Sequence, residues 1–471
     1  MFFNSVEFLL FLPIVFVTYW FFFPKNVSGQ NIIILFASYV FYGWWDWRFL
    51  SLIIFSTCLD FFLGIKIHSS KFSNKKFYLI ISIVCNLGIL GFFKYFNFFI
   101  SSLQKSFLAI GYTFDSWSLS IILPVGISFY TFQTLSYSFD IFNNNLKPTK
   151  DFISYSAFVS FFPQLVAGPI ERAKNLLPQF LNKRYFHSTN AINGCSLIVY
   201  GLFKKVVIAD RLAIYVNSVF NDYYSYNSIS LTLAVVFFAI QIYCDFSGYS
   251  LIARGTAKLF GFELMVNFNR PYFSQSITEF WRRWHISLST WFRDYLYIPV
   301  GGNRISKKRT YINIMLVFVV SGLWHGANWT FIFWGFIHGF FAIVFLMFSN
   351  NSKMKNKNRF RKYLNILFVF IIVNFAWIFF RSENITHAFK YVYHILQFDF
   401  SYNLVEICAE KGPLNLFISL LSIFLLYLSY LLPKSLIFDK PLKTVIFNVV
   451  VLLLILVLGV NGEPEFIYFQ F

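Results

Sequence analysis

Residues 311–348 read YINIMLVFVVSGLWHGANWTFIFWGFIHGFFAIVFLMF and contain no lysine, arginine, aspartate or glutamate. A helix needs only ~20 apolar residues to cross the hydrocarbon core of a bilayer, so this stretch is long enough for more than one crossing. The segment GLWHGAN at 322–328 interrupts it with small and polar residues. The stretch therefore predicts two membrane helices joined at a break that contains a histidine.

The rest of the chain has the same character. Hydrophobic residues make up 58% of its 471 residues and charged residues only 13%, about half the ~25% of a soluble globular protein. Apolar segments near membrane-spanning length recur from the N-terminus onward, and they do not alternate with the period of two that a transmembrane barrel requires. We therefore expect a polytopic all-α membrane protein, a single domain over 1–471, with about 11–13 transmembrane helices. The segments 152–190 and 262–300 are expected to add re-entrant or interfacial helices.

The net charge of +19 comes with an arrangement that is typical of membrane proteins. Its basic residues form short runs between apolar segments, with the strongest runs at 66–76, 304–309, 353–362 and 434–443. Basic loops of this kind face the cytoplasm and orient the protein, so nucleic-acid binding is not expected. The five cysteines are scattered without a CxxC pair, and neither a disulfide framework nor a metal site is predicted.

Residues 276–302, SITEFWRRWHISLSTWFRDYLYIPVGG, depart from the apolar pattern. Ser276 and Glu279 form a capping box ahead of about 20 residues of expected helix. Charged residues inside that helix are costly in lipid, so it lies at the membrane interface or beside a wet cavity. This segment has two interpretations. It is either an aromatic and basic helix that anchors the protein at the membrane interface and has no catalytic role, or a helix that lines a polar cavity.

The break at Gly322 to Gly326 is expected to lie within the membrane. A helix over the 12 residues 311–322 would rise ~18 Å, less than the ~30 Å thickness of the hydrocarbon core. Irregular backbone at that depth occurs only where protein or trapped water satisfies its polar groups. Asn328 is well placed to cap the next helix. These features put His325 on an irregular turn inside the membrane, near a helix N-terminus.

His325 is the leading candidate for chemistry. A neutral imidazole can accept a proton near pH 7, as a general base must when a hydroxyl attacks an acyl thioester. The helix N-terminus after Asn328 would favour the neutral ring. The alternative is a hydrogen-bonded packing residue, which is also what we expect of His338. His285 is the second candidate, because it shares its expected helix with several polar side chains.

Asp245 is a further candidate, because acidic residues at membrane depth are costly and often functional. It lies in the segment IYCDFSGYS, where Gly248 could break the helix. The alternative for Asp245 is a hydrogen bond between helices.

The strings FWRRWHISLSTWFRDYLYIPVGG and GLWHGANWTFIFWGFIHG closely resemble the membrane-bound O-acyltransferase superfamily. Within it they are similar to the bacterial branch that O-acetylates alginate or peptidoglycan or transfers D-alanine to teichoic acids. FFPQLVAGPIERAKNLLPQF, QIYCDFSGYS and the terminal FIYFQF are similar as well. The resemblance covers essentially the whole chain and is most specific in the signature core 262–340. One departure is Leu251, which follows FSGYS where that branch often has an acidic residue.

The resemblance implies a many-helix fold around a narrow tunnel through the bilayer. The family's catalytic histidine matches His325, and its other signature histidine matches His285. Trp324, Asn328, Arg283 and Asp245 are then expected to support or line the tunnel. The resemblance further implies acetyl-CoA as donor substrate, with no bound cofactor, and an exported partner with an SGNH-hydrolase-like fold that acylates a polysaccharide outside.

We therefore expect an acyltransferase of the bacterial inner membrane that moves an acetyl group from a cytoplasmic donor to a cell-wall or exported polysaccharide. One alternative is D-alanyl or other acyl transfer to teichoic-acid-type acceptors. Another is a transporter that moves an acyl species without forming a covalent bond, and a third is a scaffold that recruits an external transferase. The sequence does not identify the acceptor glycan.

Overall fold

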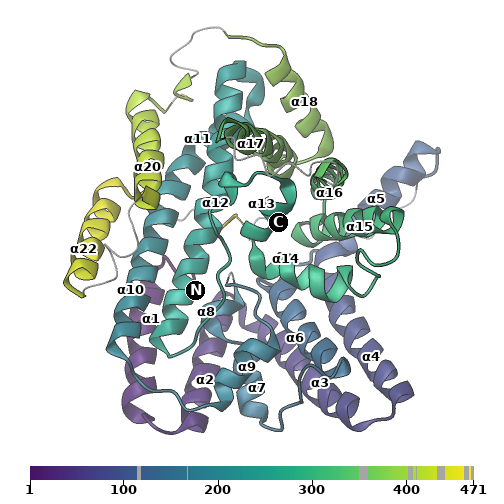
Figure 1. Ribbon diagram of the computed structural model, residues 1–471, viewed down its shortest axis with the longest axis vertical. Helices are drawn as coiled ribbons and strands as arrows, with labels where there is room; N and C mark the ends of the chain where they lie inside the picture. Colours follow the sequence, from purple (N-terminus) through teal and green to yellow (C-terminus); the bar gives the residue numbers. More distant parts are fainter. Residues whose placement is uncertain are drawn as a thin grey trace. The chain divides into compact units, whose positions relative to one another are not determined.

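The computed structural model describes residues 1–113, 118–166, 168–349, 359–400, 407–409, 411–431, 441–460 and 466–467. Across these ranges the secondary structure is helical, without a strand (Figure 1). Seven segments are long and apolar enough to cross a membrane, namely Val27–Ser69, Phe72–Ala109, Ser188–Asn221, Ser228–Leu259, Trp329–Phe348, Arg359–Arg381 and Pro413–Leu431. Val6–Phe22 and Leu442–Leu458 are shorter apolar helices. The expected polytopic all-α class is confirmed, whereas the count of 11–13 crossings stays a prediction.

The contacts divide the chain into two compact units. The first comprises Met1–Cys195 and Ala253–Met265, and the second comprises Ser196–Ile252 and Val266–Phe471. Two helices, α10 (Ser188–Leu202) and α12 (Ser228–Leu259), contribute residues to both units. The expectation of a single domain stays a prediction.

The first unit is built from a series of helices, several of them long enough to span. These are α1 (Val6–Val17), the π-turn η1 (Thr18–Phe22), α2 (Val27–Asp46), α3 (Leu50–Ser69), α4 (Phe72–Leu90), α5 (Phe96–Ala109), α6 (Ile127–Phe142), α7 (Phe152–Val159), α8 (Phe162–Leu165) and α9 (Ala173–Leu181). Helices α3, α4 and α6 lie side by side (Figure 1). By contrast, α5 has no buried residue.

A buried polar network joins α3, α4 and α6. The carboxylate of Asp60 accepts hydrogen bonds from Ser82 (2.5 Å), Asn86 (2.8 Å) and Ser138 (3.0 Å). Buried polar groups of membrane helices need such partners, because lipid offers none. The network therefore fixes how these three helices pack, and the sequence did not single out Asp60.

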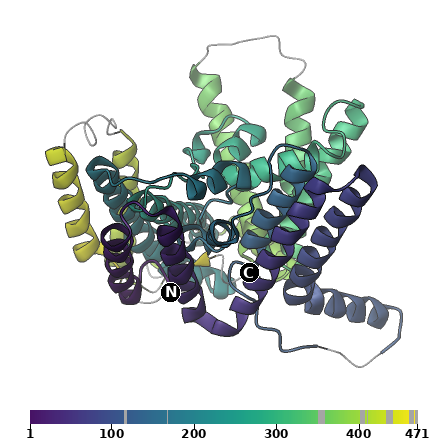
Figure 2. The same cartoon turned by 90° about the horizontal axis from the view of Figure 1, so that it is seen from below.

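The second unit carries the signature segment. After α12 follow the 3₁₀ turn η6 (Pro271–Phe273), α13 (Ile277–Arg283), α14 (Ile286–Phe292), the π-turn η7 (Arg293–Tyr297), α15 (Lys307–His325), α16 (Trp329–Ser349), α17 (Arg359–Arg381), α18 (Ile385–Leu396), α20 (Pro413–Leu431) and α22 (Pro441–Leu458). The π-turn η4 (Phe203–Ala209) joins α10 to α11 (Asp210–Asn221). Helices α16 and α17, green at the top of Figure 2, contact each other.

Glycines bring α15 and α16 together. A Cβ atom at Gly322 would collide with the backbone oxygen of Phe331, and one at Gly335 would collide with that of Phe318. Small residues at a membrane helix interface allow this close backbone approach. Gly322 is therefore part of the helix interface, and the predicted break at this residue is wrong because α15 continues to His325.

Candidate active site

The structure brings His285 and His325 together. Their imidazole centroids are 6.5 Å apart, and both side chains are buried, with 0% and 3% exposure. His325 is the last residue of α15, and His285 immediately precedes α14. Two histidines that are 40 positions apart in the sequence therefore share one site, as the resemblance implied.

The surroundings of His325 are mainly aromatic. Its ring lies 5.0 Å from Trp324, 5.0 Å from Trp334 and 5.5 Å from Phe380. Trp324 is also 6.1 Å from His285, so this indole contacts both imidazoles. Trp324 thus lies beside both histidines, and its role in lining the tunnel stays a prediction, whereas the sequence did not point to Trp334 or Phe380.

The prediction that His325 lies on an irregular turn is wrong, because His325 is the last residue of helix α15. Helix α15 has 19 residues, which corresponds to a rise of ~28 Å, so the argument from a 12-residue helix fails. The irregular backbone is confined to 326–328. His325 therefore lies between the partially negative end of α15 and the partially positive start of α16, and not beside a helix N-terminus alone.

Asn328 caps α16, as predicted. Its side-chain oxygen accepts a hydrogen bond from the backbone N–H of Thr330 at 3.1 Å. Its amide donates to the backbone oxygen of Glu383 at 2.7 Å, beyond the end of α17. These two bonds tie the turn that follows His325 to a second helix, so the contacts of Asn328 position that turn.

His285 lies at a break that the sequence did not predict. The expected helix of about 20 residues ends at Arg283 and restarts at Ile286, and His285 adopts a left-handed conformation with φ +41°. Asn267 replaces the missing helical bonds. Its side-chain oxygen accepts from the Ser287 N–H at 3.1 Å, and its backbone oxygen accepts from the Ile286 N–H at 2.9 Å.

The same asparagine favours one tautomer of His285. Asn267 Oδ1 accepts from a backbone N–H and is therefore an acceptor, and it lies 3.3 Å from His285 Nδ1, which favours a proton on Nδ1. The lone pair is then on Nε2. Burial lowers the pKa of His285 to about 3, so the ring is neutral at pH 7. Asn267 is thus a site residue that the sequence analysis missed.

Arg283 is directed to Glu279, one turn back along α13. The capping box is present, since Ser276 Oγ accepts from the Glu279 N–H at 3.1 Å. The Glu279 carboxylate accepts from the Gln275 N–H at 2.8 Å and pairs with the Arg283 guanidinium at 2.6 Å. The structure therefore gives Arg283 a contact that stabilises the start of α13, and a tunnel role for it stays a prediction.

Asp245 belongs to a buried charge cluster. Lys205 Nζ lies 2.8 Å from both Asp245 and Asp210, and the backbone N–H of Ile467 donates to Asp245 at 2.9 Å. Helix α12 runs unbroken past Gly248, so the predicted break there is wrong. The residue after Asp245 is Phe246, whose phenyl ring is 4.6 Å from His285, and a tunnel role for Asp245 stays a prediction.

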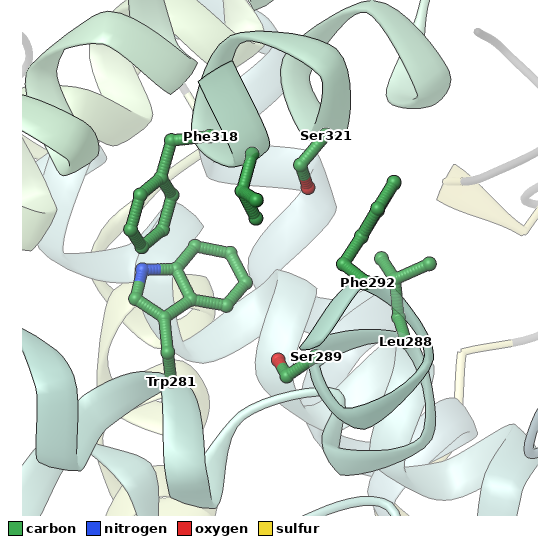
Figure 3. A pocket seen from close by; sticks show the side chains of 7 residues that line it. Trp281, Leu288, Ser289, Phe292, Phe318 and Ser321 are labelled. Carbon is green, nitrogen blue, oxygen red and sulfur yellow. The ribbon is translucent and has the colours of Figure 1, made fainter. Parts of the chain in front are cut away.

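A cavity of about 100 Å³ lies between α13, α14 and α15 (Figure 3). It is lined by Trp281, Leu288, Ser289, Phe292, Val317, Phe318 and Ser321. The hydroxyls of Ser289 and Ser321 face it from opposite sides (Figure 3). Ser321 precedes His325 by four residues in α15, so this hydroxyl and that imidazole share a helix face, and Ser289 lies in α14, which begins directly after His285.

His338 supports the wall of this cavity. Its Nδ1 accepts a hydrogen bond from Trp281 Nε1 at 3.3 Å, and its ring lies 4.9 Å from Trp334. The expected packing role of His338 is confirmed by these contacts. Trp334 stands between His338 and His325, so the cavity wall and the histidine pair form one continuous aromatic cluster.

The chain is similar to known acyltransferases. The profile described as MBOAT, membrane-bound O-acyltransferase family, matches residues 107–384. The probable alginate O-acetylase AlgI of Pseudomonas aeruginosa is 40% identical over 82% of this chain and 73% of that protein. The peptidoglycan O-acetyltransferase of Helicobacter pylori is 37% identical over 82% of this chain and 78% of that protein. The teichoic acid D-alanyltransferase of Bacillus subtilis is 28% identical over 57% of this chain and 71% of that protein.

Proposed function

The chain belongs to the membrane-bound O-acyltransferase family, and from this premise we propose that it moves an acetyl group from cytoplasmic acetyl-CoA to a polysaccharide outside the membrane. It is an O-acyltransferase and a multi-pass membrane protein. The observation that carries the proposal is the buried pair of His285 and His325, together with a small cavity whose lining residue Ser321 lies one turn before His325 in α15.

His325 is the general base in the proposed reaction. An acceptor hydroxyl oxygen attacks the carbonyl carbon of the thioester while His325 takes the hydroxyl proton. The new C–O bond forms, the C–S bond breaks, and the proton passes from the imidazolium to the sulfur, which leaves as the thiol of coenzyme A. In the same site, Nε2 of the neutral His285 ring would act as a hydrogen-bond acceptor, and the contact with Asn267 keeps that ring oriented.

The size of the cavity favours a short acyl group. At about 100 Å³ it is smaller than an apolar protein cavity of ~150 Å³ that binds benzene. An acetyl or propionyl group fits such a space, whereas a long fatty acyl chain does not. The hydroxyl of Ser321 lines the cavity and could donate to the carbonyl oxygen of that group, whereas the Ser289 hydroxyl donates to the backbone oxygen of Trp284.

The basic start of α15 supports coenzyme A as the donor. Lys307, Lys308 and Arg309 begin the helix whose other end carries His325, and the cavity lies between them. Arg309 and Ser321 are separated by ~18 Å along the helix. Phosphates bound at the basic end would let the thioester arm extend along α15 toward the cavity. The alternative is that these residues only orient the protein.

The relatives support the proposed kind of acceptor. Two of them are named for O-acetylation of alginate and of peptidoglycan, which supports a polysaccharide acceptor and a location in the bacterial inner membrane. An exported partner with an SGNH-hydrolase-like fold would complete the transfer outside. D-alanyl transfer is the second candidate, favoured by the similarity to a teichoic acid D-alanyltransferase, though at a lower identity of 28%.

The test replaces His325 in the organism that encodes the chain. Membranes carrying His325→Ala or His325→Gln receive acetyl-CoA labelled in the acetyl group, and base-labile label on the glycan is counted. We expect a loss of at least ~100-fold at an unchanged protein level. His187→Ala, an exposed histidine in the first unit, is the matched control. Retained activity in the His325 variants would contradict the proposal, and label from a carrier protein loaded with D-alanine would favour the second candidate.

A further inference from the structure

The first unit contains a second cavity, separate from the histidine site. It has a volume of about 270 Å³ and lies between the end of η1, the start of α2 and the segment after α9. Its lining residues are Lys25, Val27, Gln30, Lys183, Arg184 and Tyr185. Three of these six are cations and none is an acid, which distinguishes this cavity from the apolar one beside the histidines.

Arg184 is a buried cation with neutral partners. Its guanidinium donates to the Tyr19 hydroxyl (2.6 Å), the Gln179 backbone oxygen (2.8 Å) and the Asn31 side-chain oxygen (2.6 Å). Among the described residues it forms no ion pair, although it is only 6% exposed. A buried charge without a counter-ion is costly. Three of its five N–H donors are used, which leaves two for an anionic ligand.

Gln30 provides an independent sign of a ligand. It is 1% exposed and lines the cavity, and its Nε2 has no hydrogen-bond partner within the described part of the chain. Buried amide groups are nearly always hydrogen-bonded, so such a donor calls for an acceptor. The start of α2 adds to the attraction for an anion, because Val27 lines the cavity at the positive end of that helix.

Lys25 and Lys183 complete the basic site. Both are exposed, and neither forms an ion pair in the part of the chain that the structure describes. Large apolar side chains lie next to the site in the sequence and face outward, with exposures of 75% for Phe21, 71% for Phe22 and 51% for Phe186. Cations beside exposed apolar residues at the end of a membrane helix are typical of headgroup contacts.

We propose that this cavity binds a phosphate group, held by Arg184, Gln30 and the two lysines, and that the phosphate is the headgroup of an anionic phospholipid. The phosphate would supply the counter-ion that Arg184 lacks and the acceptor that Gln30 lacks. The lipid tails would extend over the exposed phenylalanines. This site does not depend on acyl transfer, so the proposal stands apart from the function proposed above.

The test measures lipid binding to the purified full chain by native mass spectrometry. The probes are phosphatidylglycerol, a diacylglycerol that lacks phosphate, and soluble glycerol phosphate. The test variants are Lys25→Gln/Lys183→Gln and Gln30→Leu, and the control Lys71→Gln/Lys76→Gln removes the same charge from exposed lysines at the start of α4. Size-exclusion profiles and Tm values verify that each variant is folded.

We expect one tightly bound phosphatidylglycerol per wild-type chain. Because a lysine near an anionic membrane surface contributes about fivefold to binding, the double lysine variant should bind about 25-fold more weakly. Gln30→Leu should weaken binding by about tenfold, and the control should stay within twofold of wild type. Equal affinity for glycerol phosphate would identify a free phosphate as the ligand. Unchanged binding in both test variants, or equal binding of diacylglycerol, would overturn the proposal.

Discussion

Replacing Trp281 by leucine should change which acyl groups the enzyme accepts. The indole forms one wall of the cavity between α13, α14 and α15 (Figure 3). It donates a hydrogen bond to His338, which holds it in place. One methylene in an apolar pocket alters specificity by about 10- to 200-fold. Butyryl exceeds acetyl by two methylenes, so the wild-type enzyme should prefer acetyl by at least ~100-fold. Removing the indole should reduce this preference to about tenfold or less.

The substitution also has a cost in stability. Trp281 is 8% exposed, and truncation of a buried tryptophan to alanine typically costs about 3–5 kcal/mol. Leucine keeps part of that packing, so the cost for Trp281→Leu should be lower but still measurable as a reduced Tm. Because a lower yield would reduce all activities alike, the informative quantity is the ratio of butyryl to acetyl transfer at equal protein level.

The assay supplies membranes with acetyl-, propionyl- or butyryl-CoA and counts base-labile acyl groups on the glycan. Leu316→Ala is the matched control, since Leu316 lies on α15 but is 39% exposed and does not line the cavity. We expect the control to keep the wild-type ratio. A folded Trp281→Leu enzyme with the wild-type ratio would refute the assignment of this cavity to the acyl group. Absence of transfer by wild type would refute the proposed function itself.

Three further outcomes are expected. Lys205→Met should lower the Tm strongly, because it leaves the carboxylates of Asp210 and Asp245 buried without their cation, a loss of about 3–5 kcal/mol. Gly322→Ala should cost about 1–3 kcal/mol, because its Cβ would push α15 away from α16. His285→Gln should reduce the pH dependence of the Tm. The pKa of His285 is about 3 in the folded protein and ~6.5 in the unfolded chain. As the pH falls below ~6.5, the unfolded chain therefore binds a proton that the folded protein does not bind. This proton stabilises the unfolded chain, so the stability of the wild-type protein decreases.

Each of these outcomes has a control in the same protein. Lys174→Met, on a helix of the first unit, removes an exposed lysine, and a Tm loss equal to that of Lys205→Met would contradict the importance of the cluster. Gly88→Ala adds a methyl group where a Cβ meets no atom within 4 Å, so it should be nearly neutral. A His285→Gln protein whose Tm falls between pH 7 and pH 5 as steeply as that of wild type would contradict the buried, neutral imidazole.

Much of the fold could be predicted from local sequence. The recurring apolar segments predicted a membrane protein of helices, and the capping residues Ser276 and Asn328 marked helix starts that the structure confirms. Helix ends were less predictable. Gly322 and Gly248 were interpreted as breaks, whereas both lie inside helices. In each case the glycine serves close contact with another helix, since a Cβ at Gly248 would meet the backbone oxygen of Gly201.

The amino-acid sequence alone determined the class of the protein and the identity of its two principal histidines, because hydropathy and short motifs are local properties. Tertiary structure decided what surrounds them. Asn267 holds the left-handed turn at His285 from 18 residues away, and Lys205 pairs with Asp245 from 40 residues away. Such partners are chosen by how buried polar groups satisfy one another once the helices have packed, and no local pattern along the chain encodes that choice.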